Sequence, residues 1–176
     1  ITLCSLVSGF IFTYAIIVMP GLSNLNDKEF IRAFQVTDAV IQNNQPIFML
    51  TWIGSIVSLL STVFTSILSF GLSETWLVVL LSIFYLLGVH GITIVIHIPL
   101  NNQIQKVVIE ALNDEAIKDE RVKFERKWKY FNKIRKNISI LVSLLLLILL
   151  SLRLRVLKKQ AKRIQSEHKM QYSVPY

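Results

Sequence analysis

The chain has only one cysteine, Cys4, and it lies in an apolar run. This excludes an internal disulfide and any metal site built from several cysteines. Charged residues are scarce as well: they make up 17% of 176 residues, whereas a soluble domain is usually about one quarter charged. The glycine patterns of a dinucleotide-binding turn and of a P-loop are missing. These absences argue against a soluble, nucleotide-dependent enzyme.

Apolar residues make up 53% of the chain and gather in long uncharged runs, which indicates an integral membrane protein. We predict an all-α fold, a membrane four-helix bundle with spans at about 1–19, 47–70, 76–100 and 137–152. The first run lacks the basic start and the cleavage site of a signal peptide, so we interpret it as a span. The last span is short, but basic side chains at both ends can snorkel to lengthen it.

The net charge of +8 comes mostly from basic clusters that adjoin apolar spans. Such clusters indicate anchoring at a membrane surface rather than nucleic-acid binding. Residues 1–152 form the predicted membrane domain, and residues 153–176 form a basic C-terminal tail. We expect membrane lipids as partners, no nucleic acid, and a location in the plasma (bacterial inner) membrane. A homo-oligomer or a larger membrane complex stays open, as does the orientation in the membrane.

Two polar connections are predicted to be helical. Residues 26–42 form an amphipathic helix on the membrane or over the bundle mouth, with Asn26 and Glu29 spaced as in a capping box. Asp38 projects from its apolar face, either to reach water at an edge or to point into a pocket. The second long loop, 101–137, holds a charged helix. One face of that helix carries Trp128, Asn132 and Arg135.

Several patterns within the spans predict how they pack and end. Pro20 and Pro99 are expected to end the first and third spans. A small-residue face is expected to let another helix approach, and a hydroxyl stripe on the second span to form interhelical hydrogen bonds. The face consists of Ser5, Gly9 and Thr13, and the stripe of Thr51, Ser55, Ser58, Thr62, Thr65 and Ser69.

The third span carries two histidines on one polar stripe. At about 100° per residue, His90, Thr93, His97 and Asn101 fall in one sector of a helix. His90 and His97 are separated by about 10 Å along the axis, which disfavours a shared metal ion. The histidines can be structural, can transfer protons or, least favoured, can each bind a separate metal. We predict no metal site.

Three pieces of the chain carry a family resemblance: MPGLSNLNDKEFIRAFQ with the following QNNQP, then LLGVHGITIVIHIPLNNQI, then FERKWKYFNKIRKNIS. In this order they resemble the anthrone-oxygenase-like family of small four-span membrane proteins, long described as a domain of unknown function. The resemblance covers roughly residues 8–150, and IPLNN and W-x3-N-x2-R are its most specific parts. His97 and Asp38 stand where the family often has Asn. The resemblance implies a membrane bundle with a polar pocket and an oxygenase activity.

Together the pattern and the resemblance predict one site at the loop end of the bundle. His90, His97 and Asp38 are the candidate catalytic residues, and Asn101, Asn102, Asn132, Arg135, Trp128 and Trp52 the candidate substrate-binding residues. A histidine, or else Asp38, would remove a proton from an anthrone-like or other lipophilic aromatic substrate. Arg135 and the asparagines would stabilise the enolate oxygen, with Arg135 paired to Asp38. Dissolved oxygen would then react without a cofactor.

A non-catalytic role competes with this oxidoreductase hypothesis. The serine and threonine stripe, the basic tail and the incomplete catalytic constellation also fit a small membrane subunit of a larger complex. The same features fit a module that binds a lipid or a quinone.

Overall fold

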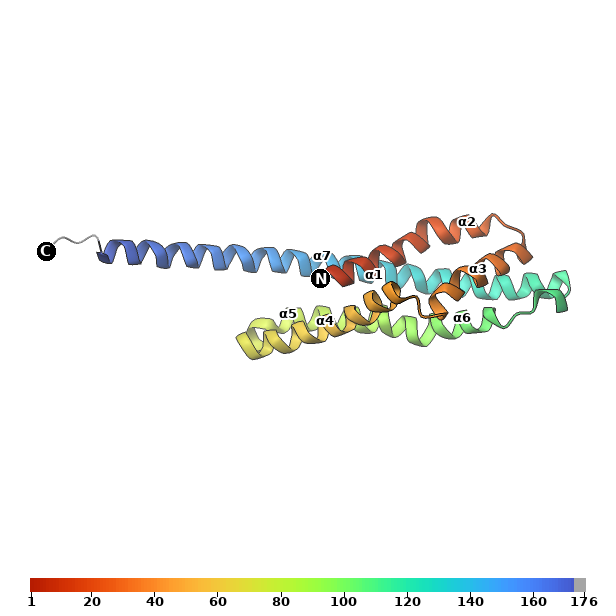
Figure 1. Cartoon of the computed structure of the whole chain (residues 1–176), viewed down its shortest axis with the longest axis horizontal. Coiled ribbons are helices and arrows are strands. Elements are labelled where there is room, and N and C mark those ends of the chain that lie inside the picture. Colours follow the sequence, from red (N-terminus) through yellow and green to blue (C-terminus); the bar gives the residue numbers. More distant parts are fainter. Residues whose placement is uncertain (173–176) are drawn as a thin grey trace.

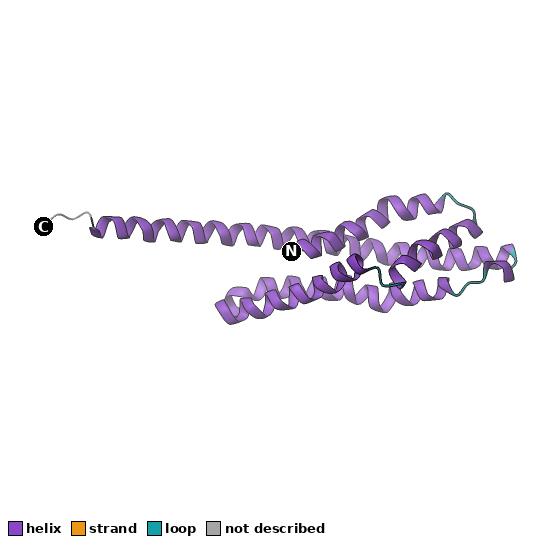
Figure 2. Ribbon diagram, in the orientation of Figure 1, coloured by secondary structure: helices purple, strands orange, loops and turns teal. Residues whose placement is uncertain are grey.

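The computed structural model describes the backbone of residues 1–172 and the side chains of residues 1–166. Within this part of the chain all regular elements are helical and no strand occurs, which confirms the predicted all-α class (Figure 2). Four segments there are long and apolar enough to cross a membrane: Thr2–Ser23, Pro46–Phe70, Leu72–Gln105 and part of Asp114–Ser166. The chain is therefore a membrane protein whose apolar helices contact lipid.

The elements follow one another with short connections. In order they are α1 (Thr2–Thr13), the π-helical turn η1 (Tyr14–Val18), α2 (Met19–Ser23), α3 (Asp27–Gln42), α4 (Pro46–Phe70), α5 (Leu72–Tyr85), the π-helical turns η2 (Leu86–Gly91) and η3 (Thr93–His97), α6 (Ile98–Gln105), the 3-10 turn η4 (Ile109–Ala111) and α7 (Asp114–Tyr172).

The spans pack as a ring of four. Helix α1 packs against α4 and α7, and α5 packs against the same two helices. Figure 1 shows the α4–α5 hairpin at one end of the bundle and the α2–α3 and α6–α7 connections at the other, which we call the loop end. Helix α3 packs against α6 and α7 there. It covers the bundle mouth, which is one of the two locations predicted for this amphipathic helix.

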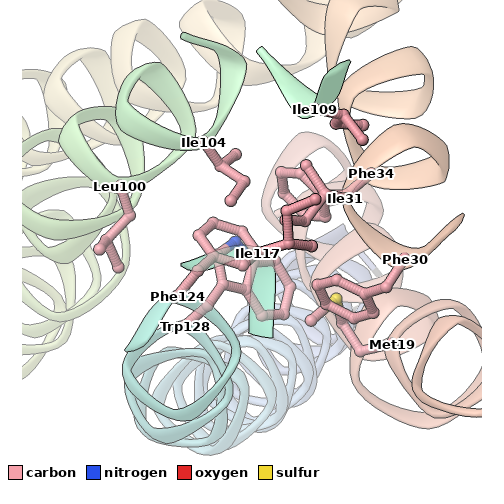
Figure 3. Packing of buried hydrophobic residues seen from close by; sticks show 10 residues of the cluster. All are labelled: Met19, Phe30, Ile31, Phe34, Leu100, Ile104, Ile109, Ile117, Phe124 and Trp128. Atoms are coloured by element: carbon pink, nitrogen blue, oxygen red, sulfur yellow. The ribbon is translucent and has the colours of Figure 1, made fainter. Parts of the chain in front are cut away.

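Two apolar cores support this arrangement. One lies between the spans and includes Cys4, Ile11, Tyr85 and Val142. The other lies at the loop end, where α2, α3, α6 and α7 meet (Figure 3). Its members are Met19, Phe30, Ile31, Phe34, Leu100, Ile104, Ile109, Ile117, Phe124 and Trp128. Because α3 contributes three of these buried side chains, the loop between the first two spans is a fixed part of the fold.

Local polar contacts fix α3 in place. The capping box is present: the Asn26 side chain accepts from the Glu29 amide at 2.9 Å, and Glu29 accepts from the Asn26 amide at 3.4 Å. Arg121 of α7 donates to the carbonyls of Ser23 and Leu25 and to the Asp27 carboxylate, at 2.9, 2.8 and 2.9 Å. The start of α3 is thereby attached to α7.

The two prolines do not end their helices, so this part of the prediction is wrong. The first span continues to Ser23 and the third to Gln105. A π-helical turn precedes each proline, and the amides of Met19 and Ile98 donate to the carbonyls five residues back. A proline has no amide hydrogen and crowds the carbonyl four residues earlier. Widening the helix into a π turn relieves this conflict without exposing the backbone to lipid.

The small-residue patterns also behave differently from the prediction. Gly9 and Thr13 are exposed, and a Cβ added to Gly9 would meet nothing within 4 Å. The hydroxyls of Thr51, Thr62 and Thr65 donate to carbonyls of their own helix. Serine and threonine in a helix satisfy themselves in this way when no neighbour is near. Ser55 is the stripe residue that bonds to another helix, at His90.

Candidate polar cavity

A cavity of about 410 Å³ lies at the loop end of the bundle. Its polar lining comes from α3 and the turn after it, from η3 and α6, and from α7: Asp38, Gln42, Asn44, Thr93, His97, Asn101, Asn102 and Arg135. Its aromatic lining is Phe10, Tyr14, Phe34, Phe48, Trp52 and Trp128. We call this the polar cavity. It contains seven of the nine residues predicted for the site.

Asp38 is buried, with 3% of its surface exposed, and its carboxylate lies in a set of amide donors. Asn101 donates to Oδ1 at 2.6 Å, while Gln42 and Gln105 donate to Oδ2 at 2.7 and 3.2 Å. The other end of the Asn101 amide accepts from the Trp128 indole at 3.2 Å. Of the two interpretations of Asp38, the one that places it in a pocket is confirmed.

Arg135 belongs to a second buried group on α7. Its Nε donates to Asn132 at 2.8 Å and its Nη1 to Thr93 at 3.0 Å, while its Cζ lies 5.6 Å from the centre of the Trp128 ring. The Trp128, Asn132 and Arg135 side chains are at most 5% exposed. Asn132 does not line the cavity, but its side chain accepts the hydrogen bond that holds the Arg135 guanidinium in place.

His97 is a buried residue of the polar lining whose side chain has no hydrogen-bond partner. It is 2% exposed, and its ring lies edge-on to Trp128 with 5.0 Å between centroids. Neither ring nitrogen has a hydrogen-bond partner. A buried polar group left unpaired costs about 1–3 kcal/mol, so a native protein rarely retains one without a reason.

His90 lies elsewhere. Its Nε2 is 3.1 Å from the Ser55 hydroxyl, and its ring packs between Trp52 and Tyr85. It does not line the polar cavity, although Trp52 does. The π turns η2, which contains His90, and η3, which ends at His97, explain the divergence, because each adds a residue to a turn and rotates the following face away from the α-helical position.

The predicted ion pair between Asp38 and Arg135 is wrong. Within 4.0 Å, no ion pair among the described side chains joins the two. Both nevertheless line the same cavity, so it holds a carboxylate and a guanidinium that neutral groups satisfy separately. Asn102 is exposed and lines the same cavity.

Sequence reasoning missed several polar residues of this site, including Tyr14, Gln42 and Gln105. Gln42 follows Asp38 by four residues and Gln105 follows Asn101 by four, so each pair shares a helix face. That spacing could have identified both glutamines. Tyr14 lies within an apolar span, where a single tyrosine does not by itself indicate a polar site. Among the described residues, no group of three or more His, Cys, Asp and Glu is close enough to hold a metal ion.

Residues 45–145, more than half of the chain, match the model of the family described as anthrone oxygenase. This chain belongs to the anthrone oxygenase family. Searches among curated proteins and among solved structures found no match to it. The family segment includes His97, Asn101, Trp128 and Arg135, whereas Asp38 and α3 precede it.

The two motifs that are most specific to the anthrone oxygenase resemblance meet in the polar cavity. Asn101 of IPLNN accepts from Trp128, the first residue of W-x3-N-x2-R, and Arg135, its last residue, contacts Thr93 of the third span. The family motifs thus join α6 and η3 to α7 around one cavity. Chemically, this cavity offers a histidine without partners, a guanidinium and a carboxylate, within aromatic walls.

Proposed function

We propose that this member of the anthrone oxygenase family is a membrane enzyme that oxidises an anthrone-like substrate with molecular oxygen. His97 acts as the base and Arg135 stabilises the enolate oxygen. The observation that carries the proposal is His97, a buried histidine with two unpartnered ring nitrogens on the wall of an aromatic-lined cavity. A ligand that hydrogen-bonds to this ring removes the cost of leaving it unpaired.

Asp38 is a weaker candidate for the base because its two oxygens already accept three amide hydrogen bonds. His90 is also a weaker candidate, because it is outside the cavity lining and bonds to Ser55. Arg135 suits the role of an anion-stabilising group. Its Nε and Nη1 are held by Asn132 and Thr93, so the guanidinium is oriented before a substrate binds.

The proposed reaction needs oxygen as its one co-reactant. His97 takes a proton from the methylene carbon, and the resulting enolate passes one electron to O2. The radical pair couples into a carbon–oxygen bond, and protonation gives a hydroperoxide. Removal of the second methylene proton breaks the O–O bond, leaves a carbonyl and releases hydroxide, which departs as water. One oxygen atom ends in the product and one in water, and the substrate loses four electrons.

The test is oxygenation of anthrone by the purified chain in liposomes. We expect one O2 consumed per anthraquinone formed, and with ¹⁸O2 one labelled atom in the new carbonyl. Because anthrone also oxidises slowly by itself, protein-free liposomes provide the background rate. A rate equal to that background would refute the proposal.

Non-catalytic binding of a quinone or lipid is the competing function. The observation that favours it is a second, apolar cavity of about 590 Å³ beside the polar one. Under this function the chain binds anthraquinone saturably without accelerating the oxidation of anthrone.

A further inference from the structure

The second cavity differs from the polar cavity in its lining. It is formed by α1, by the last turns of α3 and by the start of α4, and most of its side chains are apolar. Thr37, Gln45 and Thr51 are its polar side chains apart from Tyr14 and Trp52. We call it the apolar cavity. None of the predicted site residues except Trp52 contributes to it.

The mouth of the apolar cavity faces the lipid. Leu6 and Val40 are each 55% exposed and Ile47 is 71% exposed, and all three line the cavity. Leu6 and Ile47 belong to membrane-spanning segments. Large apolar side chains gathered at an opening are unfavourable in water and favourable against hydrocarbon. The opening is therefore suited to molecules dissolved in the bilayer.

The two cavities share a wall of side chains. Phe10, Tyr14, Ile41, Phe48 and Trp52 line both. Phe10 of α1 contacts Phe48 of α4, with 5.0 Å between ring centroids, and Phe48 stacks on Trp52 at 5.5 Å. Phe10 and Phe48 are only half-buried. Such side chains change rotamer without a movement of the backbone, so this contact can open for a ligand and close behind it.

We propose that the apolar cavity is the entrance through which a lipophilic substrate passes sideways from the bilayer into the polar cavity, displacing the Phe10–Phe48 contact. The identity of the substrate, a flat and uncharged multi-ring ketone, rests on the proposed function. Such a molecule concentrates in hydrocarbon, so a route from the side spares it a passage through water. Its carbonyl then meets the polar groups only after it has passed the aromatic wall.

An entrance has a kinetic signature that a binding contact lacks. A side chain that narrows it slows entry and exit equally and leaves the dissociation constant unchanged. The experiment uses the full chain in liposomes with Trp76→Phe as background, because Trp76 lines neither cavity. Anthraquinone is the probe, and its quenching of the Trp52 and Trp128 fluorescence is followed by stopped flow.

The matched pair is Val40→Phe and Val36→Phe. Both valines are exposed on α3 one turn apart, at 55% and 66%, but Val36 does not line the apolar cavity. We expect Val40→Phe to lower the association and dissociation rates about tenfold while Kd stays within threefold. Val36→Phe leaves both rates unchanged. If Val40→Phe does not fold, Leu6→Phe replaces it, with exposed Leu50→Phe as its control.

Equal rates in Val40→Phe and Val36→Phe would overturn the entrance. The entrance would also be overturned if Asn102→Phe slowed association and dissociation while Val40→Phe did not. Asn102 is exposed and lines the polar cavity, so that result would place the route there. The proposed function fails separately. If anthraquinone binds with these rate changes but anthrone is not oxidised, the entrance stands and the oxygenase does not. If anthrone is oxidised but Val40→Phe and Val36→Phe give equal rates, the oxygenase stands and the entrance does not.

Discussion

Asp38 and Arg135 line the same cavity and carry opposite charges, yet each is satisfied by neutral partners rather than by the other. Amides of Gln42, Asn101 and Gln105 hold the carboxylate, whereas Asn132 and Thr93 hold the guanidinium. Direct pairing would cancel most of their field. In the function proposed above, the two separated charges polarise the substrate, an arrangement suited to electrostatic catalysis.

Replacing Arg135 by lysine tests this arrangement. Lysine keeps the positive charge but loses the planar fork, so it cannot donate to Asn132 and Thr93 from two fixed nitrogens. We expect the rate of anthrone oxidation to fall about 10²–10³-fold, the effect of losing one oriented donor to a developing anion. Arg126→Lys, at an exposed site on the same helix, is the control. Turnover of Arg135→Lys at the wild-type rate would remove Arg135 from the reaction.

Asp38→Asn changes the acceptor that organises the cavity. An asparagine offers one oxygen and one NH2 group, so at least one of the three amide donors would face another donor. We expect the free energy of unfolding to fall by about 1–3 kcal/mol, measured by thermal unfolding in detergent. Asp119→Asn, at an exposed position of α7, should leave it unchanged. An Asp38→Asn protein as stable as the control would mean that the amides rearrange freely.

Much of the fold was predictable because the membrane imposes simple rules on sequence. Long uncharged runs identify the spans, and the apolar face of residues 26–42 identifies α3 with its buried Phe30, Ile31 and Phe34. The face shared by Trp128, Asn132 and Arg135 follows from α-helical periodicity, and on it Arg135 contacts both Trp128 and Asn132. Periodicity succeeds where a helix is regular.

The sequence-based predictions are wrong where a helix is irregular or where a polar group has several possible hydrogen-bond partners. The π turns before Pro20 and Pro99 allow both helices to continue, and sequence gives no direct sign of them. In the third span, the π turns η2 and η3, which contain the two histidines, also separate His90 from His97, although an ideal helix places them on one side. The partners of Asp38 depend on which amides tertiary packing brings near. Charge complementarity favours Arg135 as the partner of Asp38. Gln42, one turn after Asp38, and Gln105, one turn after Asn101, bond to the carboxylate instead.

His97→Asn tests the proposed base. Asparagine is similar in size and can hydrogen-bond, but its amide does not accept a proton near neutral pH. We expect oxidation of anthrone to slow about 10²–10⁴-fold, the usual contribution of a positioned base. His90→Asn is the comparison: it removes the bond to Ser55, so stability should fall, while turnover per folded molecule falls less than tenfold. If His90→Asn is the variant that abolishes turnover, the two histidines have been assigned the wrong way round.

Gly88→Ala tests the close packing of the third span against α7. A Cβ at Gly88 would lie 2.7 Å from Cδ1 and 2.9 Å from Cγ2 of Ile138, closer than carbon atoms tolerate. We expect unfolding to become easier by about 1–3 kcal/mol, the usual cost of overpacking. Gly9→Ala is the matched control, because nothing lies within 4 Å of its added Cβ and alanine favours a helix interior by about 0.5–1 kcal/mol. Thermal unfolding in detergent should therefore move in opposite directions for the two glycines. Ile138→Ala added to Gly88→Ala should recover part of the loss by removing the clashing atoms, and a double variant no more stable than Gly88→Ala would show that the clash is not its cause.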